Sequence, residues 1–448
     1  MGYGWRRFGP TDAFGWYKTR LRSLVIGSFL NLGIFLYTHP DILQIPFIST
    51  QTHLVALGSS IDTYQTQDQG ATTMSATPDE VTRGPRPKPV LMIPLRRCGT
   101  HALRLRLNFN PDFYAPYPLH IVDFMPTVPL YGNLEDDRAY FRLVSDVVGL
   151  QAASMVKWPG IVFDPVEIFE AIRHEPRSVH RIVWELLLRA GEQRHARVVM
   201  DKSLDSVHYA DELMRLFPDM LFLNVVRDPR AQIASMNKAI IHDFDTLLNA
   251  QTWLEAHRAA DAIIEQYPQR TLTIRYEDFL TDQEGVLRKI CEFFGIEFLP
   301  NMLDVSHSQE AQQISRMSAL WSSNCFPPIM ANIDKYKKVL SMDEIATIEV
   351  MTGEYMQCYG YQRITNTTAV FDMAQFDEAR DRSNQARIKA WRELEHTNFR
   401  DFALRCHRAE YLASVRWRML QAGTARAAQN DAAPAKLDTL SKAFEVTD

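Results

Sequence analysis

Four short apolar segments, each followed by a polar motif and then by a helix-prone stretch, constrain the fold of this chain most. They are residues 89–94, 196–200, 221–226 and 271–274, and the helices expected after them are 102–107, 207–216, a segment starting near 231, and 283–294. Apolar runs of this length indicate buried strands. Strands that alternate with helices indicate a parallel sheet covered on both faces. The sequence therefore predicts an α/β fold, a parallel sheet flanked by helices.

Each polar motif falls at the carboxyl end of its strand, where open parallel sheets bind ligands. The motifs are Arg96-Arg97-Cys98-Gly99-Thr100-His101, Asp201-Lys202-Ser203, Arg227-Asp228-Pro229-Arg230 with Ser235, and Arg275-Tyr276-Glu277-Asp278. Because these ends meet at one edge of the sheet, the sequence predicts a ligand site there.

The first motif places a glycine turn between a strand and a helix, so backbone N–H groups would face an anion. Arg96 and Arg97 add positive charge and Thr100 adds a hydroxyl donor. Two interpretations stay open from the residues alone, a phosphate cradle or a basic turn that caps a helix. The loop lacks the GxxxxGK[ST] pattern and its magnesium ligand, which argues against ATP or GTP hydrolysis.

The third motif pairs an arginine at a strand end with a serine in the next helix. Arg227 and Ser235 are eight residues apart, and both side chains can meet one phosphate. Arginine suits phosphate because its planar fork donates two parallel hydrogen bonds. An Arg-Asp ion pair at the start of a helix is the alternative interpretation.

Taken together and in this order, the motifs resemble the PAPS-dependent sulfotransferases, where PAPS is 3′-phosphoadenosine-5′-phosphosulfate. Three later segments are also similar to this family: Trp253 before the Arg275 motif, residues 291–296, and residues 336–340. The similarity covers about residues 88–361 and is nearest to bacterial and carbohydrate-modifying members. It implies a P-loop NTPase-like sulfotransferase fold and transfer of a sulfuryl group from PAPS to a hydroxyl or amine.

The resemblance also implies roles for individual residues. Arg97 and Lys202 would stabilise the transferring group, and His120 would act as general base, with Asp123 as the second candidate. The residues implied to bind PAPS are Arg96, Arg97, Gly99, Thr100, His101, Arg227, Ser235, Tyr276 and Lys337. PAPS is the only co-substrate implied, and no metal is expected.

The chain departs from the family pattern at two places. Cys98 and His101 stand where serine and threonine are commoner, so any charge on His101 would depend on pH. The late basic loop lacks the family's Arg-Lys-Gly sequence, and Lys335, Lys337 and Lys338 are the candidates to replace it.

The acceptor suggested by Asp201-Lys202-Ser203 is a saccharide or a lipid-linked saccharide. The net charge of −5 argues against a nucleic-acid partner. Two other functions stay open, a P-loop small-molecule kinase and a non-catalytic nucleotide-binding module. The kinase would need a Walker lysine and a magnesium carboxylate, and the binding module would show no turnover.

We expect four regions: a leader at 1–49, a linker at 50–87, a sulfotransferase domain at 88–365, and a helical extension at 366–448 with a disordered end. The linker is rich in Thr, Gln, Ser, Gly and Pro. The leader holds an apolar run, residues 24–37, that is short for a spanning helix. A cytoplasmic protein is expected, with membrane association through this run left open. Five scattered cysteines without a CxxC pair favour a reducing compartment.

Overall fold

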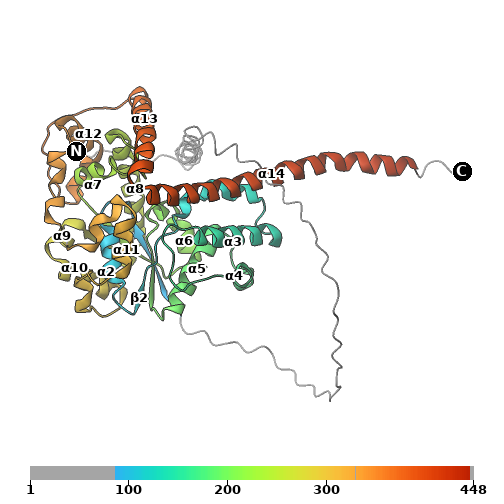
Figure 1. Cartoon of the computed structure of the whole chain (residues 1–448), viewed down its shortest axis with the longest axis horizontal. Coiled ribbons are helices and arrows are strands. Elements are labelled where there is room, and N and C mark those ends of the chain that lie inside the picture. Colours follow the sequence, from blue (N-terminus) through green and yellow to red (C-terminus); the bar gives the residue numbers. More distant parts are fainter. Residues whose placement is uncertain (1–85, 328, 444–448) are drawn as a thin grey trace, which may run out of the picture.

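The computed structural model describes residues 86–327 and 329–443, with side chains through residue 423, and its centre is a five-stranded parallel sheet. The strand order is β2-β3-β1-β4-β5. The strands are β1 (Lys88–Ile93), β2 (Phe113–Tyr114), β3 (Val198–Asp201), β4 (Leu221–Val226) and β5 (Thr271–Arg275). The predicted parallel sheet is confirmed (Figure 1). Only β2, which is two residues long, was not predicted from the sequence.

Alternate residues of the strands enter two separate cores, because successive side chains of a strand point to opposite faces. Leu91 and Ile93 of β1 pack in one core with residues of α3, α4 and α5. Val90 and Met92 pack in the other core with residues of α2 and α10. The sheet is therefore buried on both faces, as its nearly uninterrupted apolar sequences indicate.

The helices fall into three groups along the chain. The first group is α2 (Thr100–Leu107), α3 (Asp137–Ala152), α4 (Pro165–Ile172), α5 (Val179–Gln193) and α6 (Ala210–Leu216). The second is α7 (Pro229–Met236), α8 (Thr246–Gln266), α9 (Tyr276–Thr281), α10 (Gln283–Phe294) and α11 (Gln309–Met317). The third is α12 (Met342–Cys358), α13 (Met373–Thr397) and α14 (Phe399–Ala443).

Most of the predicted helices are present, and one differs in kind. The helix predicted over 283–294 matches α10, which ends at Gly295 in a left-handed conformation (φ 73°). The segment 207–216 instead begins in a 3₁₀ helix, η4 (Leu204–Tyr209), and continues as α6. A tight turn precedes η4, because Asp201 accepts a hydrogen bond from the Ser203 N–H at 2.8 Å.

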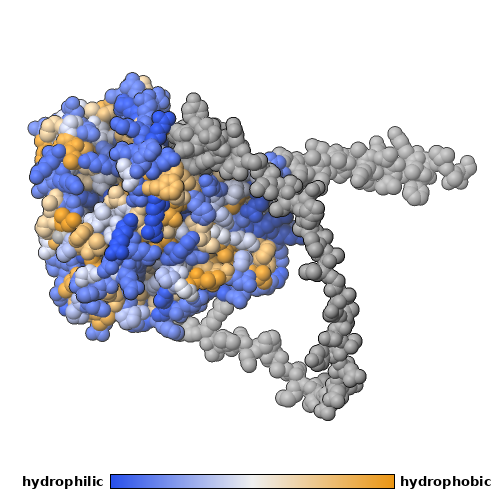
Figure 2. All heavy atoms as spheres, in the orientation of Figure 1, coloured by the Kyte–Doolittle hydropathy of each residue, from blue (hydrophilic) through white to orange (hydrophobic). Residues whose placement is uncertain are grey.

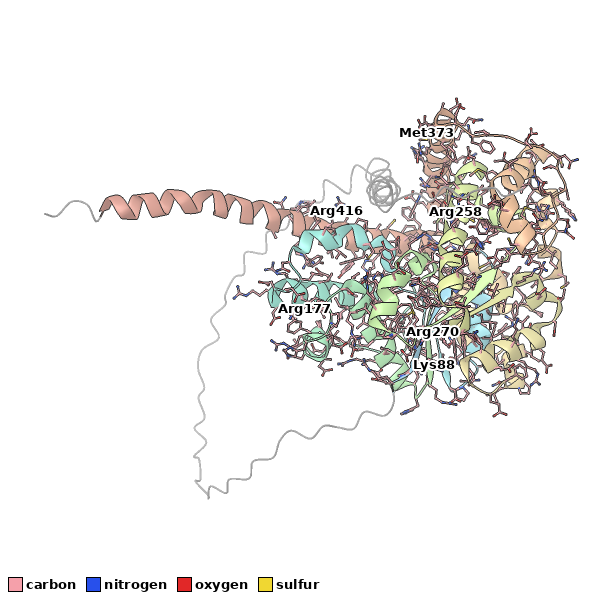
Figure 3. The ribbon with its side chains drawn as sticks, turned by 180° about the vertical axis from the view of Figure 1, so that it is seen from behind. Lys88, Arg177, Arg258, Arg270, Met373 and Arg416 are labelled. Atoms are coloured by element: carbon pink, nitrogen blue, oxygen red, sulfur yellow. The ribbon has the colours of Figure 1, made fainter. Side chains whose placement is uncertain are left out.

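The C-terminal helices α13 and α14 return across the domain. In Figure 3, Lys88 at the start of β1 and Arg416 of α14 lie on opposite sides of the sheet. Figure 1 likewise shows α14 passing over the side of the domain away from the amino ends of the strands. The long extension thus reaches the side of the sheet where the polar motifs lie.

Some expectations fall outside the described residues, namely the leader at 1–49 and the linker up to residue 85. Helix α14 is described to Ala443, and the disorder expected at the end of the chain stays a prediction. Within the described residues, none of the helices has both the length and the apolar character needed to cross a membrane.

Candidate active site

The loop after β1 takes a conformation that depends on glycine. Gly99 has φ 77°, in the left-handed region, and it precedes the first residue of α2. A Cβ at this position would lie 2.2 Å from the ring of Tyr276. Tyr276 is buried and packs against the loop, so its place beside the predicted phosphate cradle is fixed by this contact. Its predicted contact with the nucleoside stays a prediction.

Cys98, in the same loop, points into the protein core. Its side chain is fully buried, and the thiol donates a hydrogen bond to the Leu95 carbonyl at 2.9 Å. Burial raises the pKa of the Cys98 thiol to about 12, so the thiol stays protonated. Cys98, which stands where serine is commoner in the family, therefore contributes to the packing beneath the loop.

Arg97, Arg227 and Ser235 converge in this structure. Arg97 donates from Nε to Ser235 Oγ at 3.0 Å, and Arg227 donates from Nη1 to the Arg97 carbonyl at 2.8 Å. Burial and the neighbouring Arg227 charge lower the pKa of Arg97 to about 10. Two guanidinium groups held side by side disfavour each other's charge, and a bound anion would relieve this.

Arg227 is further tied to a late segment of the chain and to Tyr276. Its Nη2 donates to the Asn332 carbonyl at 2.9 Å, and its guanidinium lies 4.7 Å from the centre of the Tyr276 ring. Its Nε is buried and has no hydrogen-bond partner within the described part of the chain. A buried donor of this kind suits the oxygen of a phosphate group.

Helix α7 braces the same loop through a two-step hydrogen-bond chain. Buried Trp253 donates from its indole N–H to Gln232 Oε1 at 3.0 Å. Gln232 then donates from Nε2 to the Arg96 carbonyl at 2.7 Å. The tryptophan that belongs to the sequence pattern thus helps to fix the loop backbone.

Lys202 follows β3 and is buried beside a concentration of positive charge. Burial, followed by the charges of Arg104 and Arg96, lowers the pKa of Lys202 to about 7. Arg96 itself is paired with Asp205. Lys202 and Arg96 both line one cavity at the carboxyl edge of the sheet. Lys202 is therefore only partly charged near neutral pH, and a nearby anion would favour its charged form.

His120, the predicted general base, lies on the same cavity in a strained backbone conformation. Its φ of 51° lies in the left-handed region, as does that of Arg97 at 72°, and His195 is the third such non-glycine residue among those described. Strain of this kind often occurs at functional sites. The His120 N–H donates to Ser203 Oγ at 3.3 Å, which places His120 next to the Lys202 segment.

Burial, and then the charges of Arg96, Lys202 and Arg408, hold the pKa of His120 well below its ordinary value. The imidazole is therefore neutral at neutral pH and able to accept a proton, and its buried Nδ1 has no hydrogen-bond partner among the described residues. Asp123, the other candidate base, lines the same cavity and is paired with Arg408 at 3.1 Å.

His101 belongs to an aromatic group that also lines the cavity. Its ring stacks on Tyr117 at 5.7 Å between centroids and meets the edge of Trp321 at 6.1 Å. Burial, and then the Lys202 and Arg104 charges, place the pKa of His101 well below its ordinary value. The histidine is thus neutral at neutral pH.

The cavity has a volume of about 270 Å³ and joins some of the predicted residues to others that were not predicted, but its lining does not include Arg227, Ser235 or Tyr276. Arg96, Arg97, Thr100, His101, His120, Asp123 and Lys202 line it. The further residues are Ile240 and Ile241, Met155, Trp321, and a set from α13 and α14: Trp391, Arg405, Arg408, Ala409, Leu412 and Arg416. The helical extension therefore forms one wall of the site.

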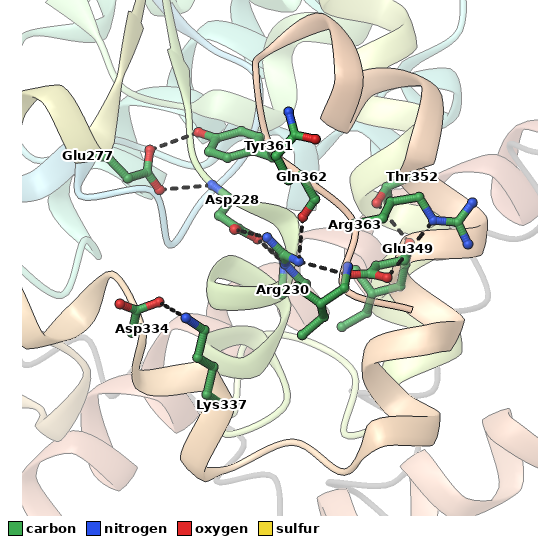
Figure 4. A network of polar contacts seen from close by, with 12 residues as sticks. Asp228, Arg230, Glu277, Asp334, Lys337, Glu349, Thr352, Tyr361, Gln362 and Arg363 are labelled. Atoms are coloured by element: carbon green, nitrogen blue, oxygen red, sulfur yellow. Dashed lines mark hydrogen bonds and ion pairs between the residues drawn. The ribbon is translucent and has the colours of Figure 1, made fainter. Parts of the chain in front are cut away.

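Two basic residues of the late motifs lie elsewhere. Lys337 is half-exposed in a 3₁₀ helix, residues 335–338, and pairs with Asp334 at 2.7 Å. Arg230 is buried and holds α7 to α12, because it donates to both Asp228 and Glu349 at 2.7 Å (Figure 4). Neither side chain lines the cavity. Lys337 as a ligand of PAPS stays a prediction.

No group of three or more metal-ligating side chains occurs within residues 86–327 and 329–443. All five cysteines are free thiols. What the site offers instead is basic: a glycine loop at a helix N-terminus, two adjacent arginines, a buried lysine and a neutral histidine. Such a set of side chains is suited to an anionic group.

Three comparisons relate the chain to known proteins. Residues 89–300 match the model of the sulfotransferase family. The omega-hydroxy-beta-dihydromenaquinone-9 sulfotransferases Stf3 of Mycobacterium bovis and Mycobacterium tuberculosis are each 27% identical to the chain over 206 residues. That alignment covers 42% of this chain and 46% of each relative. The chain thus spans about half the length of the curated relatives it matches.

Two solved structures are also similar. The sulfotransferase domain from the Synechococcus PCC 7002 olefin synthase is 19% identical with a TM-score of 0.44, covering 63% of this chain and 97% of that one. Sulfotransferase STF9 from Mycobacterium avium is 14% identical with a TM-score of 0.35, covering 63% and 79%.

Through residues 89–300, which match its model, the chain is similar to the sulfotransferase family.

Proposed function

We propose that the chain transfers a sulfuryl group from PAPS to an acceptor hydroxyl and releases 3′-phosphoadenosine-5′-phosphate (PAP). The observation that supports this donor most is the meeting of Arg97, Arg227 and Ser235. Both arginines hydrogen-bond to neutral oxygens, a serine hydroxyl and backbone carbonyls. Their charges are therefore available to an anion with two phosphate groups.

The glycine loop and Arg97 would hold the 5′-phosphosulfate, as the position of the loop before α2 favours. Arg227 and Ser235 would hold the 3′-phosphate. The acceptor oxygen forms a bond to sulfur while the bond from sulfur to the 5′-phosphate oxygen breaks. That bonding pair goes to the phosphate, and Arg97 and Lys202 stabilise the charge that develops.

The acceptor proton goes to a general base, for which we propose His120. The neutral imidazole and its position on the Lys202 cavity support the choice. Asp123 lines the same cavity, but its carboxylate pairs with Arg408. His120→Ala should therefore abolish turnover and spare PAP affinity, whereas full turnover by this variant would shift the role to Asp123.

For the acceptor, we propose a hydroxyl carried by a molecule with an apolar part. Ile240, Ile241 and Leu412 line the cavity beside the charged residues. The Stf3 relatives are named for a hydroxylated dihydromenaquinone. A lipid-linked saccharide, the acceptor suggested by the Lys202 motif, also has an apolar part and hydroxyl groups.

Calorimetric titration with PAP tests the donor assignment. Wild type should bind PAP, and Arg227→Ala should weaken binding by about tenfold or more, because a charge-assisted hydrogen bond is lost. Arg288→Ala, an exposed arginine on α10, is the matched control and should bind as wild type does. Absence of binding by folded wild type, or an equal loss in both variants, would refute the donor.

A further inference from the structure

The extension supplies a cavity wall from outside the region that matches the family. Trp391 of α13 and Arg405, Arg408 and Leu412 of α14 line the cavity, and the family match ends at residue 300. Positions 405, 408, 412 and 416 are three or four residues apart, so they share one face of α14. This face is the part of the extension that a bound molecule would touch.

Helix α14 is held against the domain by specific contacts. Arg408 donates from Nη2 to the carbonyls of Leu119 and His120, at 2.9 and 3.1 Å. One turn further on, the Tyr411 hydroxyl donates to the Asp146 carbonyl at 2.7 Å. A Cβ at Gly149 would lie 2.2 Å from that hydroxyl, so a glycine in α3 makes room for the contact.

Arg405 is the least satisfied of these side chains. Its side chain is 9% exposed, and its Nε lies 2.9 Å from Asp401 Oδ1. Its Nη2 is buried and has no hydrogen-bond partner among the described residues. Asp401 accepts a hydrogen bond from Ser318 at 2.6 Å, which fixes the base of this pair. A rigid, partly unsatisfied guanidinium therefore faces the cavity.

The lining carries basic residues beyond those assigned to the proposed donor. Its basic residues are Arg96, Arg97, Lys202, Arg405, Arg408 and Arg416, and its only carboxylate is Asp123. Asp123 pairs with Arg408, and Asp205 pairs with Arg96. The donor accounts for Arg97 and Lys202. The buried Arg405 remains for a second anionic group.

Much of the remaining wall is apolar. Met155, Ile240, Ile241 and Leu412 line the cavity. In the view of Figure 2, hydrophobic residues occur in small separate groups on a largely hydrophilic face. At about 270 Å³ the cavity lies near the lower end of the range for small-molecule sites. It therefore suits one small molecule, or the reacting end of a larger one.

We propose that the acceptor is an anionic amphipathic alcohol, whose acidic group binds Arg405 of α14 and whose apolar body lies on Ile240, Ile241 and Leu412. This inference rests on the proposed function, because it assigns the second substrate of the same reaction. It makes Arg405 a specificity-determining residue that acts on acceptor binding and leaves donor binding unchanged.

Labelled PAPS and three matched alcohols test the proposal: ω-hydroxydecanoic acid, its methyl ester and decanol. With full-length wild type, the acid should be sulfated with a kcat/KM about tenfold or more above that of decanol or the ester. Arg405→Gln should remove this preference by raising KM for the acid only. Arg405→Lys keeps the positive charge and should retain part of the preference for the acid. Arg400→Gln, an exposed arginine on the same helix, is the control.

PAP affinity, measured by calorimetry for each variant, separates the two proposals and checks folding. Absence of PAP binding by folded wild type would refute the proposed function itself. PAP binding with equal use of the three alcohols, or with transfer to none of them, would overturn the acceptor proposal alone. An equal loss of kcat/KM for the acid and for decanol in Arg405→Gln would also overturn it, because Arg405 would then support the cavity without recognising charge.

Discussion

Arg97 donates a hydrogen bond from Nε to Ser235 Oγ at 3.0 Å, and so joins the loop after β1 to helix α7. The two residues were predicted to bind opposite ends of the donor. Their direct contact shows that these two residues, one from the loop and one from α7, lie within hydrogen-bond distance of each other.

Ser235→Ala tests whether this hydroxyl also holds the nucleotide. We expect PAP affinity to fall by about fivefold to tenfold, which corresponds to about 1 kcal/mol for one hydrogen bond. Calorimetry measures it. The exposed Ser414→Ala on α14 serves as control, and unchanged affinity in Ser235→Ala would exclude the contact with phosphate.

The pH dependence of catalysis should report on Lys202. Burial lowers its pKa to about 7, so the free enzyme holds the charged lysine below this pH and loses it above. Because kcat/KM for PAPS reflects the free enzyme, it should fall as pH rises through about 7. The pKa of His120 lies well below its ordinary value, so the base stays available across this range.

Lys202→Arg provides the decisive comparison, because arginine keeps its charge at high pH. The fall in kcat/KM above neutral pH should disappear in this variant, at a lower overall rate. Persistence of the same fall would assign it to another group. Lys289→Arg, an exposed lysine on α10, should behave as wild type.

Gly99→Ala should damage the site far more than Gly295→Ala. Both glycines have φ above 70°, so each alanine costs about 1–2 kcal/mol in backbone strain. At Gly99 the new Cβ would also lie 2.2 Å from the Tyr276 ring, whereas nothing lies within 4 Å at Gly295. Thermal unfolding and PAP titration measure the difference. Equal effects of the two substitutions would show that the Tyr276 contact is unimportant.

Glu349→Ala should destabilise the fold without altering the cavity. Glu349 is fully buried and accepts hydrogen bonds from Arg230 at 2.7 Å and from the Thr365 hydroxyl at 2.6 Å. Removing one partner of a buried ion pair costs about 3–5 kcal/mol. Urea unfolding measures this, with the exposed Glu354→Ala on α12 as control. A loss no larger than the control's would contradict the structural role.

The same carboxylate gives a direction for acid sensitivity. Burial alone would raise its pKa, but hydrogen bonds from Thr365 and Ile364 and the Arg230 pair hold the pKa of Glu349 below its usual value. The stability it adds is therefore present above the unfolded pKa of about 4.3. It should be lost as pH falls through the lower folded pKa, and wild type and Glu349→Gln should converge in stability there.

The strands and the polar motifs were predictable because buried parallel strands have uniform apolar sequences. Residues 221–226 were predicted and observed with identical bounds. Strand β2 was not, because Phe113 and Tyr114 form too short a run to give a pattern. The direction of Cys98 into the core also required the structure, since loop residues have no fixed side-chain periodicity.

The wall from α14 was missed for a different reason. Arg405, Arg408 and Leu412 have helical spacing, which was a usable signal. A stripe of this kind, however, describes any helix that packs on a domain. Only the return of α14 over the carboxyl ends of the strands identifies which face meets a ligand.

The separate origin of the two halves of the cavity has a consequence for variation within such enzymes. One half comes from the loop after β1 and from Lys202 after β3, and one side of the other half comes from a helix more than one hundred residues later in the chain. Exchanging the residues of α14 that line the cavity should alter which molecules enter and leave the donor loop intact. New specificities can therefore arise, by mutation or by design, while the chemistry stays the same.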